Sequence, residues 1–138
     1  MASNTFSLTV MSPERILVKN QESKSVLIEG AEGQIKILPQ HADFITNLEA
    51  GIFHFDLQSG GPKHGVISSG FLEVKDGSVT VTAETLELLD EIDIERAKQA
   101  EKTAIDELGR DVTDETHFNK YQLKLQRALI RQQAASRT

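Results

Sequence analysis

Apolar and polar residues alternate along the first two thirds of the chain, from Thr5 to about Thr85. A period of two places successive side chains on opposite faces of a β-strand, so one face can pack in a core while the other meets water. The apolar members of these runs are Phe6, Leu8 and Val10, then Val26 and Ile28, Ile35 and Ile37, Phe53, Phe55 and Leu57, and Val79 and Val81. The pattern predicts a series of short strands.

Turn signals interrupt these runs at short spacing. They are Ser12-Pro13, Gly30-Ala31-Glu32-Gly33, Ser59-Gly60-Gly61-Pro62 and Asp76-Gly77. Asp76-Gly77 lies between two alternating runs and predicts a type I′ hairpin, because glycine adopts positive φ without strain. Short strands joined by regular turns are typical of a β-sandwich or a flattened barrel. We therefore expect residues 1–90 to form an antiparallel β-sandwich domain.

After Asp90 the apolar period changes to that of a helix. The apolar face of the first predicted helix consists of Ile94, Ala97, Ala104 and Leu108. Asp90 or Asp93 is a suitable N-cap, and Gly109 is suited to the C′ position. A second helix is predicted to begin near 111–114, with an apolar stripe of Phe118, Tyr121, Leu125, Ala128 and Leu129. The short link predicts an antiparallel helix hairpin over residues 91–138.

A hairpin of two helices builds only a small core of its own. Its apolar stripes can bury against each other, against the sandwich or against another protein. Arrangements that differ by a few kcal/mol form a two-state element. The sequence therefore predicts an α+β chain in which the helical part can change its packing.

Charge is distributed unevenly along the chain. The formal net charge of −6 argues against nucleic acid as the main partner. Residues 91–115 are strongly acidic, whereas residues 116–138 contain no Asp or Glu. Lys120, Lys124, Arg127 and Arg131 follow helical spacing and predict one basic stripe. Such a stripe either meets an acidic surface or is a solvated helix face.

Signals for catalysis are poor, and we expect no enzyme activity. The chain has no Cys, no G-x-S-x-G and no H-E-x-x-H, and Gly30-x-x-Gly33 lacks the Gly-Lys-Ser/Thr ending of a P-loop. His41-x-Asp43 and His54-x-Asp56 each place two possible ligands on one strand face, but a two-residue pattern is common, so we expect no metal site. No apolar run approaches the length of a membrane span, and residues 1–6 do not begin a signal peptide, so we expect a soluble chain or a soluble part of an assembly.

Four segments, in order along the chain, resemble the epsilon subunits of F-type ATP synthases of bacterial or plastid type, which correspond to the mitochondrial delta subunit. They are Gly30–Thr46 with Gly51 (G-x-x-G, I-L-P, H-A, Thr, Gly), Ser69–Val74 (SGFLEV), Val79–Glu84 (VTVTAE) and Ile92–Ala97 (I-D-x-x-R-A). The sequence departs from the pattern where the family often has other residues: Lys36, Gln40 and Ser69 replace glycine, Asp43 replaces proline and Thr103 replaces an arginine. The order of motifs is kept over essentially the whole chain.

This resemblance implies a flattened sandwich of about ten strands followed by an antiparallel helix pair. It also implies a non-catalytic place in the central stalk, between the gamma subunit and the ring of c subunits, where the chain couples proton flow to ATP synthesis by the alpha and beta subunits. The predicted ring contact is the loop from Glu32 to Asp43, with Glu32, Gln34 and His41 as its polar members. The implied location is peripheral, on the cytoplasmic side of a bacterial plasma membrane rather than a plastid thylakoid.

The resemblance further implies an inhibitor of ATP hydrolysis. In this hypothesis the C-terminal helices extend and bring Lys120, Lys124, Arg127 and Arg131 to an acidic segment of the catalytic subunits. No cofactor is required, but regulatory ATP would favour the folded hairpin. The residues that match the family's ATP site are Glu87, Ile92, Asp93, Arg96, Ala97, Arg127 and Arg131. The alternative is a purely structural coupling subunit without nucleotide regulation.

Overall fold

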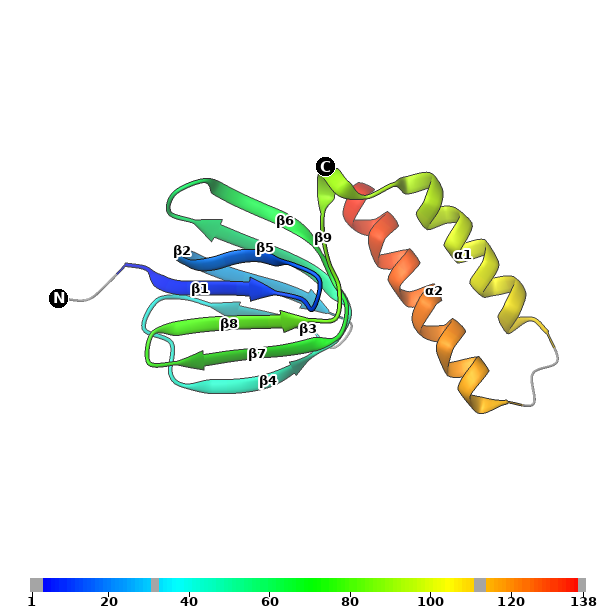
Figure 1. Ribbon diagram of the computed structural model, residues 1–138, viewed down its shortest axis with the longest axis horizontal. Helices are drawn as coiled ribbons and strands as arrows, with labels where there is room; N and C mark the ends of the chain where they lie inside the picture. The colour runs from blue at the N-terminus through cyan, green and yellow to red at the C-terminus, as the bar shows by residue number, and fades with distance from the viewer. Residues whose placement is uncertain (1–3, 31–32, 111–113, 137–138) are drawn as a thin grey trace. The chain divides into compact units, whose positions relative to one another are not determined.

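A computed structural model describes residues 4–30, 33–110 and 114–136, and the chain divides into two compact units (Figure 1). The first, Met1–Leu88, holds the strands, and the second, Leu89–Thr138, holds the helices. The expected boundary lay two residues later, after residue 90. The α+β fold class predicted from the two apolar periods is confirmed.

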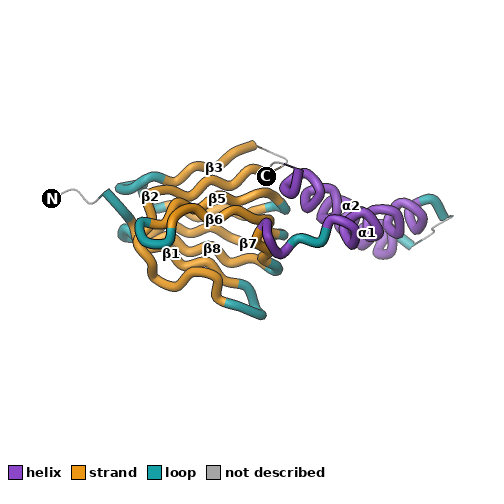
Figure 2. The backbone as a smooth tube through the Cα atoms, turned by 90° about the horizontal axis from the view of Figure 1, so that it is seen from above, coloured by secondary structure: helices purple, strands orange, loops and turns teal. Residues whose placement is uncertain are grey.

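Nine strands lie in the described part of the first unit. They are β1 (Phe6–Met11), β2 (Ile16–Gly30), β3 (Gly33–Ile37), β4 (Phe44–Leu48), β5 (Gly51–Leu57), β6 (Gly61–Ile67), β7 (Gly70–Lys75), β8 (Ser78–Ala83) and β9 (Leu86–Leu88). Their order in the sheet is β4-β7-β8-β1-β2-β5-β6-β9, and β3 pairs with β2. Figures 1 and 2 show these strands arranged as a two-layered sandwich.

The long strand β2 belongs to both layers. Its first half, from Ile16 to Ser23, pairs with β1, and its second half pairs with β3 on one side and β5 on the other. One layer is therefore β4-β7-β8-β1 with the start of β2, and the other is β3, β5, β6 and β9 with its end. Because β2 counts in each layer, nine strands supply the ten strand segments that the family resemblance predicts.

The change of layer occurs at a β-bulge beside Ser23. The pairing of β2 with β5 shifts between Ser23 and Ser25, so that Ser23 lies opposite Leu57 and Ser25 opposite Asp56. The Ser23 side chain is fully buried, and its hydroxyl lies 3.1 Å from the Ser25 carbonyl and 3.0 Å from the Asp56 carbonyl. A bulge disrupts ladder hydrogen bonds locally, and the hydroxyl donates to a carbonyl where a donor would otherwise be missing.

The core follows the predicted alternation. Strand β5 has the burial pattern in which every second residue is inside, and the Phe53 and Phe55 rings stack with their centroids 4.4 Å apart. Phe6, Leu8 and Val10 on β1 and Val79 and Val81 on β8 are also buried, as predicted. Residues from both layers form one apolar cluster, so the sandwich has a single core.

Two backbone features test the sequence predictions further. Asp76 and Gly77 both have positive φ, 50° and 79°, and connect β7 to β8 with Lys75 opposite Ser78, which confirms the type I′ hairpin. The strands are not all antiparallel, however, because β1 and β8 pair in parallel. These two strands are far apart in the sequence, so no tight turn joins them and their relative direction is free of the hairpin constraint.

The second unit contains a 3₁₀ turn (Leu89–Glu91) and the helices α1 (Ile94–Leu108) and α2 (Glu115–Ser136). Asp93 is the N-cap of α1, since its Oδ1 accepts a hydrogen bond from the Arg96 amide at 3.1 Å. Asp114 plays the same part for α2 through the Thr116 amide at 3.0 Å. Gly109 ends α1, but with φ −78° and ψ −9° it stays in the right-handed region. Gly109 is thus the C-cap itself and not the predicted C′ residue.

Helices α1 and α2 pack along each other as an antiparallel hairpin (Figure 1). The Gln132 amide donates to Glu101 Oε2 at 2.6 Å, and His117 Nε2 lies 3.3 Å from Glu107 Oε2. The buried residues of the two helices are Ala97, Ala104, Ala128 and Ala134. The predicted stripes are thus only partly correct, because several of their large members are exposed, namely Ile94, Phe118 and Leu129. Small side chains let two helices approach closely, whereas larger ones lie at the edges.

We expect Gly70→Ala to destabilise the sandwich by about 1–3 kcal/mol or more, because overpacking forces the neighbouring backbone to move. A Cβ at Gly70 would lie 2.8 Å from Ala83 Cα and 2.9 Å from the Thr82 carbonyl carbon, both in the backbone of β8. Urea unfolding followed by far-ultraviolet circular dichroism measures the change. Ser69→Ala places the same side chain one residue earlier at an exposed position and should leave the unfolding free energy within about 0.5 kcal/mol. Equal effects of the two substitutions would contradict this reasoning.

Candidate functional site: contact surfaces and a hairpin ligand site

The two ends of the sandwich carry different parts of the predicted ring-contact loop. Gly33 pairs with Gly30 and Gly30 with Gly51, which places the start of β3 beside the start of β5. Ile37, at the end of β3, lies opposite Val26 and therefore nearer the turn that joins β5 to β6. We call these the Gly33 end and the Asp76 end, since the Asp76-Gly77 turn lies at the second.

Gln34 lies at the Gly33 end, and His41 lies at the Asp76 end. The segment between them is not one loop, because residues 33–37 form strand β3. Gln34 is exposed, and its amide donates to Glu29 Oε1 at 2.7 Å. Glu32 lies outside the described residues. The structure therefore does not bring Gln34 and His41 together at one end.

The His41 loop is held against the β7–β8 hairpin. Asp43 Oδ1 accepts a hydrogen bond from the Asp76 amide at 3.0 Å, and His41 Nδ1 lies 2.7 Å from the Ala42 carbonyl oxygen. Gln40 has φ 66°, in the left-handed region where glycine is favoured. The resemblance described above has glycine at this position, and Gln40 takes a conformation that glycine adopts more easily.

The start of α1 collects four of the predicted nucleotide residues. Asp93 is exposed and caps the helix, Arg96 is exposed in the first turn, Ile92 is partly buried and Ala97 is buried. The Asp93 carboxylate already accepts from the Arg96 amide. Glu87 belongs to β9 in the other unit. Only the members between Ile92 and Arg131 therefore share one unit.

The two predicted arginines lie on α2, further along the hairpin. Gln132 contacts Glu101 at the middle of α1, so its neighbour Arg131 lies level with that region. Arg96 lies about 7.5 Å nearer the start of α1, and Arg127 lies about 6 Å beyond Arg131 along α2, at a rise of about 1.5 Å per residue. Both arginines are partly buried. A ligand that contacts the cap and both arginines must therefore run along the helix pair.

The predicted basic stripe is present on α2. Lys120 and Lys124 are exposed, and their ammonium groups lie 5.6 Å and 5.1 Å from the centre of the Tyr121 ring. Tyr121 in turn contacts the His117 ring, with centroids 4.6 Å apart. A cation over an aromatic face is attracted by it, so the tyrosine gathers the two lysines at the start of the stripe.

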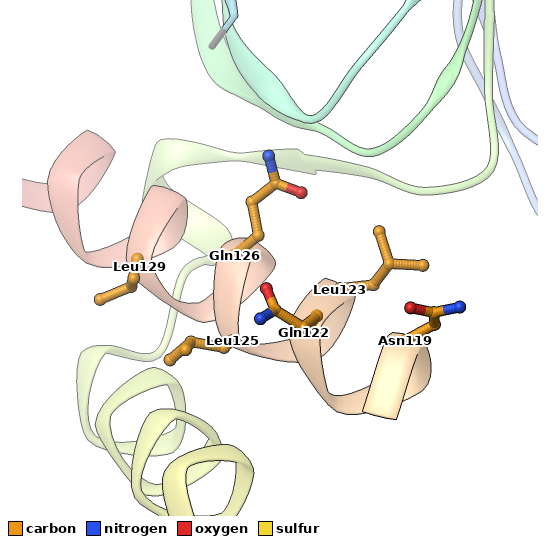
Figure 3. A pocket seen from close by; sticks show the side chains of 6 residues that line it. All are labelled: Asn119, Gln122, Leu123, Leu125, Gln126 and Leu129. Carbon is orange, nitrogen blue, oxygen red and sulfur yellow. The ribbon is translucent and has the colours of Figure 1, made fainter. Parts of the chain in front are cut away.

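Sequence reasoning missed two hollows on the surface. One, of about 590 Å³, lies along α2 (Figure 3) and is lined by Asn119, Gln122, Leu123, Leu125, Gln126 and Leu129. The other, also about 590 Å³, lies at the Gly33 end of the sandwich beside the exposed ring of Phe71 and is lined by Pro13, Asn47, Leu48, Glu49, Ser69, Gly70, Phe71, Thr82, Ala83 and Glu84. Neither is lined by a predicted nucleotide residue. The alternation of β7 places Phe71 on the outer face. A search for large apolar residues at outward positions could therefore have found it.

Sequence reasoning also missed a histidine pair. His54 on β5 lies directly opposite His64 on β6, and their Nδ1 atoms are 2.9 Å apart. Partial desolvation of this largely exposed ring, and then the neighbouring His54 ring, lower the pKa of His64 below its ordinary value. The hairpin register was the missing signal, since a turn centred on Ser59 places residues 54 and 64 opposite each other.

No group of three or more His, Cys, Asp or Glu side chains among residues 4–30, 33–110 and 114–136 is arranged to hold a metal ion. Neither helix of the described chain is both long and apolar enough to cross a membrane.

Both units match known sequence families. Residues 5–89 match a family model described as ATP synthase, Delta/Epsilon chain, beta-sandwich domain. Residues 90–136 match one described as ATP synthase, Delta/Epsilon chain, long alpha-helix domain. Together the two matches cover nearly the whole chain.

Several relatives carry the name ATP synthase epsilon chain. The protein of Syntrophomonas wolfei is 36% identical over 137 residues, which cover 99% of this chain and 98% of the relative. The protein of Carboxydothermus hydrogenoformans is 41% identical over 108 residues, which cover 78% and 79% respectively.

Two solved structures share the fold. A chain of the Euglena gracilis mitochondrial ATP synthase (OSCP, F1 and c-ring) has a TM-score of 0.81 at 23% identity, covering 100% of this chain and 84% of that one. A chain of the Tetrahymena thermophila mitochondrial ATP synthase central stalk and c-ring has a TM-score of 0.71 at 14% identity, covering 98% and 99%. At these identities the likeness concerns the fold, a sandwich followed by two helices.

Proposed function

The chain belongs to the ATP synthase delta/epsilon chain family, and from this premise we propose that it is a non-catalytic rotor subunit of the central stalk. It joins the gamma subunit to the ring of c subunits, so that proton flow turns the stalk within the alpha and beta subunits. It works at the cytoplasmic face of a bacterial plasma membrane, held there through the complex. The observation that carries this proposal is the match of both units, in order, over nearly the whole chain.

The sandwich suits a rigid coupling element. Its single core includes Phe53, Phe55 and Leu72, all fully buried, and a densely packed interior transmits strain rather than yielding to it. We assign the ring contact to the Gly33 end, because Gln34 lies there on β3. His41, at the Asp76 end, is then excluded from the same contact.

We expect Gln34→Cys to cross-link to a cysteine in the polar loop of a c subunit in intact membranes. The chain has no Cys of its own, so every cross-link reports the introduced residue. His41→Cys and Ser59→Cys, both at the Asp76 end, are the matched controls and should not cross-link to the ring. A ring cross-link found only with the two controls would assign the opposite end. A pull-down from the same membranes that recovers no gamma, alpha or beta subunit would contradict the rotor proposal itself.

The hairpin suits a regulatory element that inhibits ATP hydrolysis. It buries only alanines among its helical residues, and it leaves Ile94, Ile105, Phe118, Leu123 and Leu129 exposed. Burying an alanine removes little apolar surface from water, and Leu108, Leu125 and Ile130 are only partly buried. The compact hairpin therefore gains less from burial than the sandwich does. An extended form that places α2 and its basic stripe against an acidic subunit surface can therefore compete with the compact form.

Regulatory ATP would bind along the compact hairpin and stabilise it. Arg131 and Arg127 offer guanidinium forks suited to phosphates, and Asp93 and Ile92 lie at the start of α1. Thr103 stands where the family has a further arginine, which removes one phosphate partner. The alternative, a structural subunit without nucleotide regulation, keeps Asp93 as a helix cap and nothing more.

We expect the isolated chain to bind ATP more tightly than ADP. Arg131→Gln should weaken ATP binding roughly tenfold or more, because a charge-assisted contact is worth about 1.5–3 kcal/mol. Asp93→Asn keeps a good N-cap but removes the carboxylate charge. A change in ATP affinity in this variant would therefore report a contact with the ligand and not a loss of helix capping. Arg110→Gln, at the far end of α1 beside Glu107, is the matched control and should leave affinity unchanged. Isothermal titration calorimetry measures each affinity, and an absence of binding at millimolar ATP would end the ATP-sensing proposal while leaving the rotor role intact.

We expect truncation after Glu91 to raise ATP hydrolysis by the reconstituted complex while assembly and ATP synthesis persist, because the sandwich has its own core. In the full chain, Lys120→Ala with Lys124→Ala should raise hydrolysis more mildly, and added salt should mimic it. Lys98→Ala with Lys102→Ala, exposed lysines of α1, form the control pair and should have little effect. Loss of assembly on truncation would show that the helices are structural.

A further inference from the structure

His54 and His64 form a cross-strand pair on the outer face of the sandwich. In β5 the residues at odd numbers from 51 to 57 are buried, so His54 points away from the core. His64 is exposed and His54 partly so. The two ring centroids are 4.2 Å apart and the ring planes meet at 75°, with the two Nδ1 atoms 2.9 Å from each other.

This separation matches that of two nitrogens bound to one metal ion. With metal–nitrogen bonds of about 2.0–2.1 Å, two nitrogens at a right angle lie about 2.9 Å apart, and at a tetrahedral angle about 3.4 Å. Right-angled nitrogen ligands are typical of tetragonal Cu²⁺ and Ni²⁺ sites. We propose that His54 and His64 bind a divalent cation of the Ni²⁺ or Cu²⁺ type through both Nδ1 atoms, with water as the remaining ligands.

The metal takes the place of a hydrogen bond. At 2.9 Å one ring carries hydrogen on Nδ1 and the other accepts it. Binding requires a lone pair on both Nδ1 atoms, so the hydrogen moves to Nε2 of its own ring by exchange with water. Two neutral rings therefore bind the cation without net proton release. The lowered pKa of His64 keeps that ring in the neutral form that binds metal at neutral pH.

The charges on the same face favour a cation. Asp56 is the next residue on the outer face of β5, two positions from His54. The nearest positive charge in the same row of cross-strand neighbours is Lys36 on β3, and Leu27 on β2 lies between it and His54. Two strand spacings of about 4.8 Å separate the lysine from the histidine. The acidic neighbour is thus closer along the strand than the basic one is across the sheet.

Isothermal titration of the full chain with NiCl₂, after chelator treatment and buffer exchange, tests the proposal. We expect one Ni²⁺ per chain, and at least a tenfold loss of affinity in His54→Gln and in His64→Gln. His41→Gln, which removes an exposed imidazole from the segment between β3 and β4, should bind like the parent. Paramagnetic broadening should affect the ring signals of His54 and His64 before those of His41 and His117.

Thermal unfolding gives a second readout that does not depend on calorimetry. Ni²⁺ joins β5 to β6, so it should raise the unfolding temperature of the parent and of His41→Gln but not of His64→Gln. Circular dichroism verifies that each variant keeps the parent fold. No detectable Ni²⁺ binding, or binding that survives both the His54 and the His64 substitutions, overturns the proposal.

Discussion

The passage of β2 from one layer to the other at Ser23 is the constraint on which the sandwich depends. A strand of 15 residues that stayed in one layer could not pair with β1 along its first half and with β3 and β5 along its second. The bulge beside Ser23 supplies the bend, and the buried hydroxyl satisfies a carbonyl that the disrupted ladder leaves behind. An unsatisfied buried polar group costs about 1–3 kcal/mol, so one small hydroxyl permits the single sheet to enclose a core.

The hairpin rests on a different constraint, the close approach of two helices through alanines. The helices also carry opposite charge, since residues 91–115 are acidic and residues 116–138 contain no acid. In the hairpin, acids of α1 contact side chains of α2: Glu101 accepts from the neutral Gln132 amide, and Glu107 lies beside the His117 ring. The acidic residues of α1 can therefore serve as the partner surface for the basic residues of α2. Any outside acidic surface has to compete with it, and exposed charge pairs differ in free energy by little.

Sequence predicted the elements well because each depends on local rules. Alternation identified β1, β5 and β8, the Asp76-Gly77 pair identified its hairpin, and one of the two predicted caps, Asp93, proved to begin α1. It failed where pairing between distant segments decides the outcome: the parallel contact of β1 with β8, the dual membership of β2, and the separation of Gln34 from His41 by the length of β3. The His54–His64 pair was not predicted because its prediction requires the exact register of a single hairpin.

The two units differ in the size of the side chains that they enclose. In the sandwich, large side chains such as Phe53, Phe55 and Leu8 are fully enclosed, and moving any of them would expose apolar surface worth about 1.5–3 kcal/mol per side chain. In the hairpin the enclosed side chains are alanines, while five large apolar residues remain exposed. A rearrangement of the helices would therefore give up little burial and could gain more on another surface. The proposed rearrangement rests on the size of the residues at the helix interface, and it requires no weakness in the helices, each of which begins with an aspartate cap.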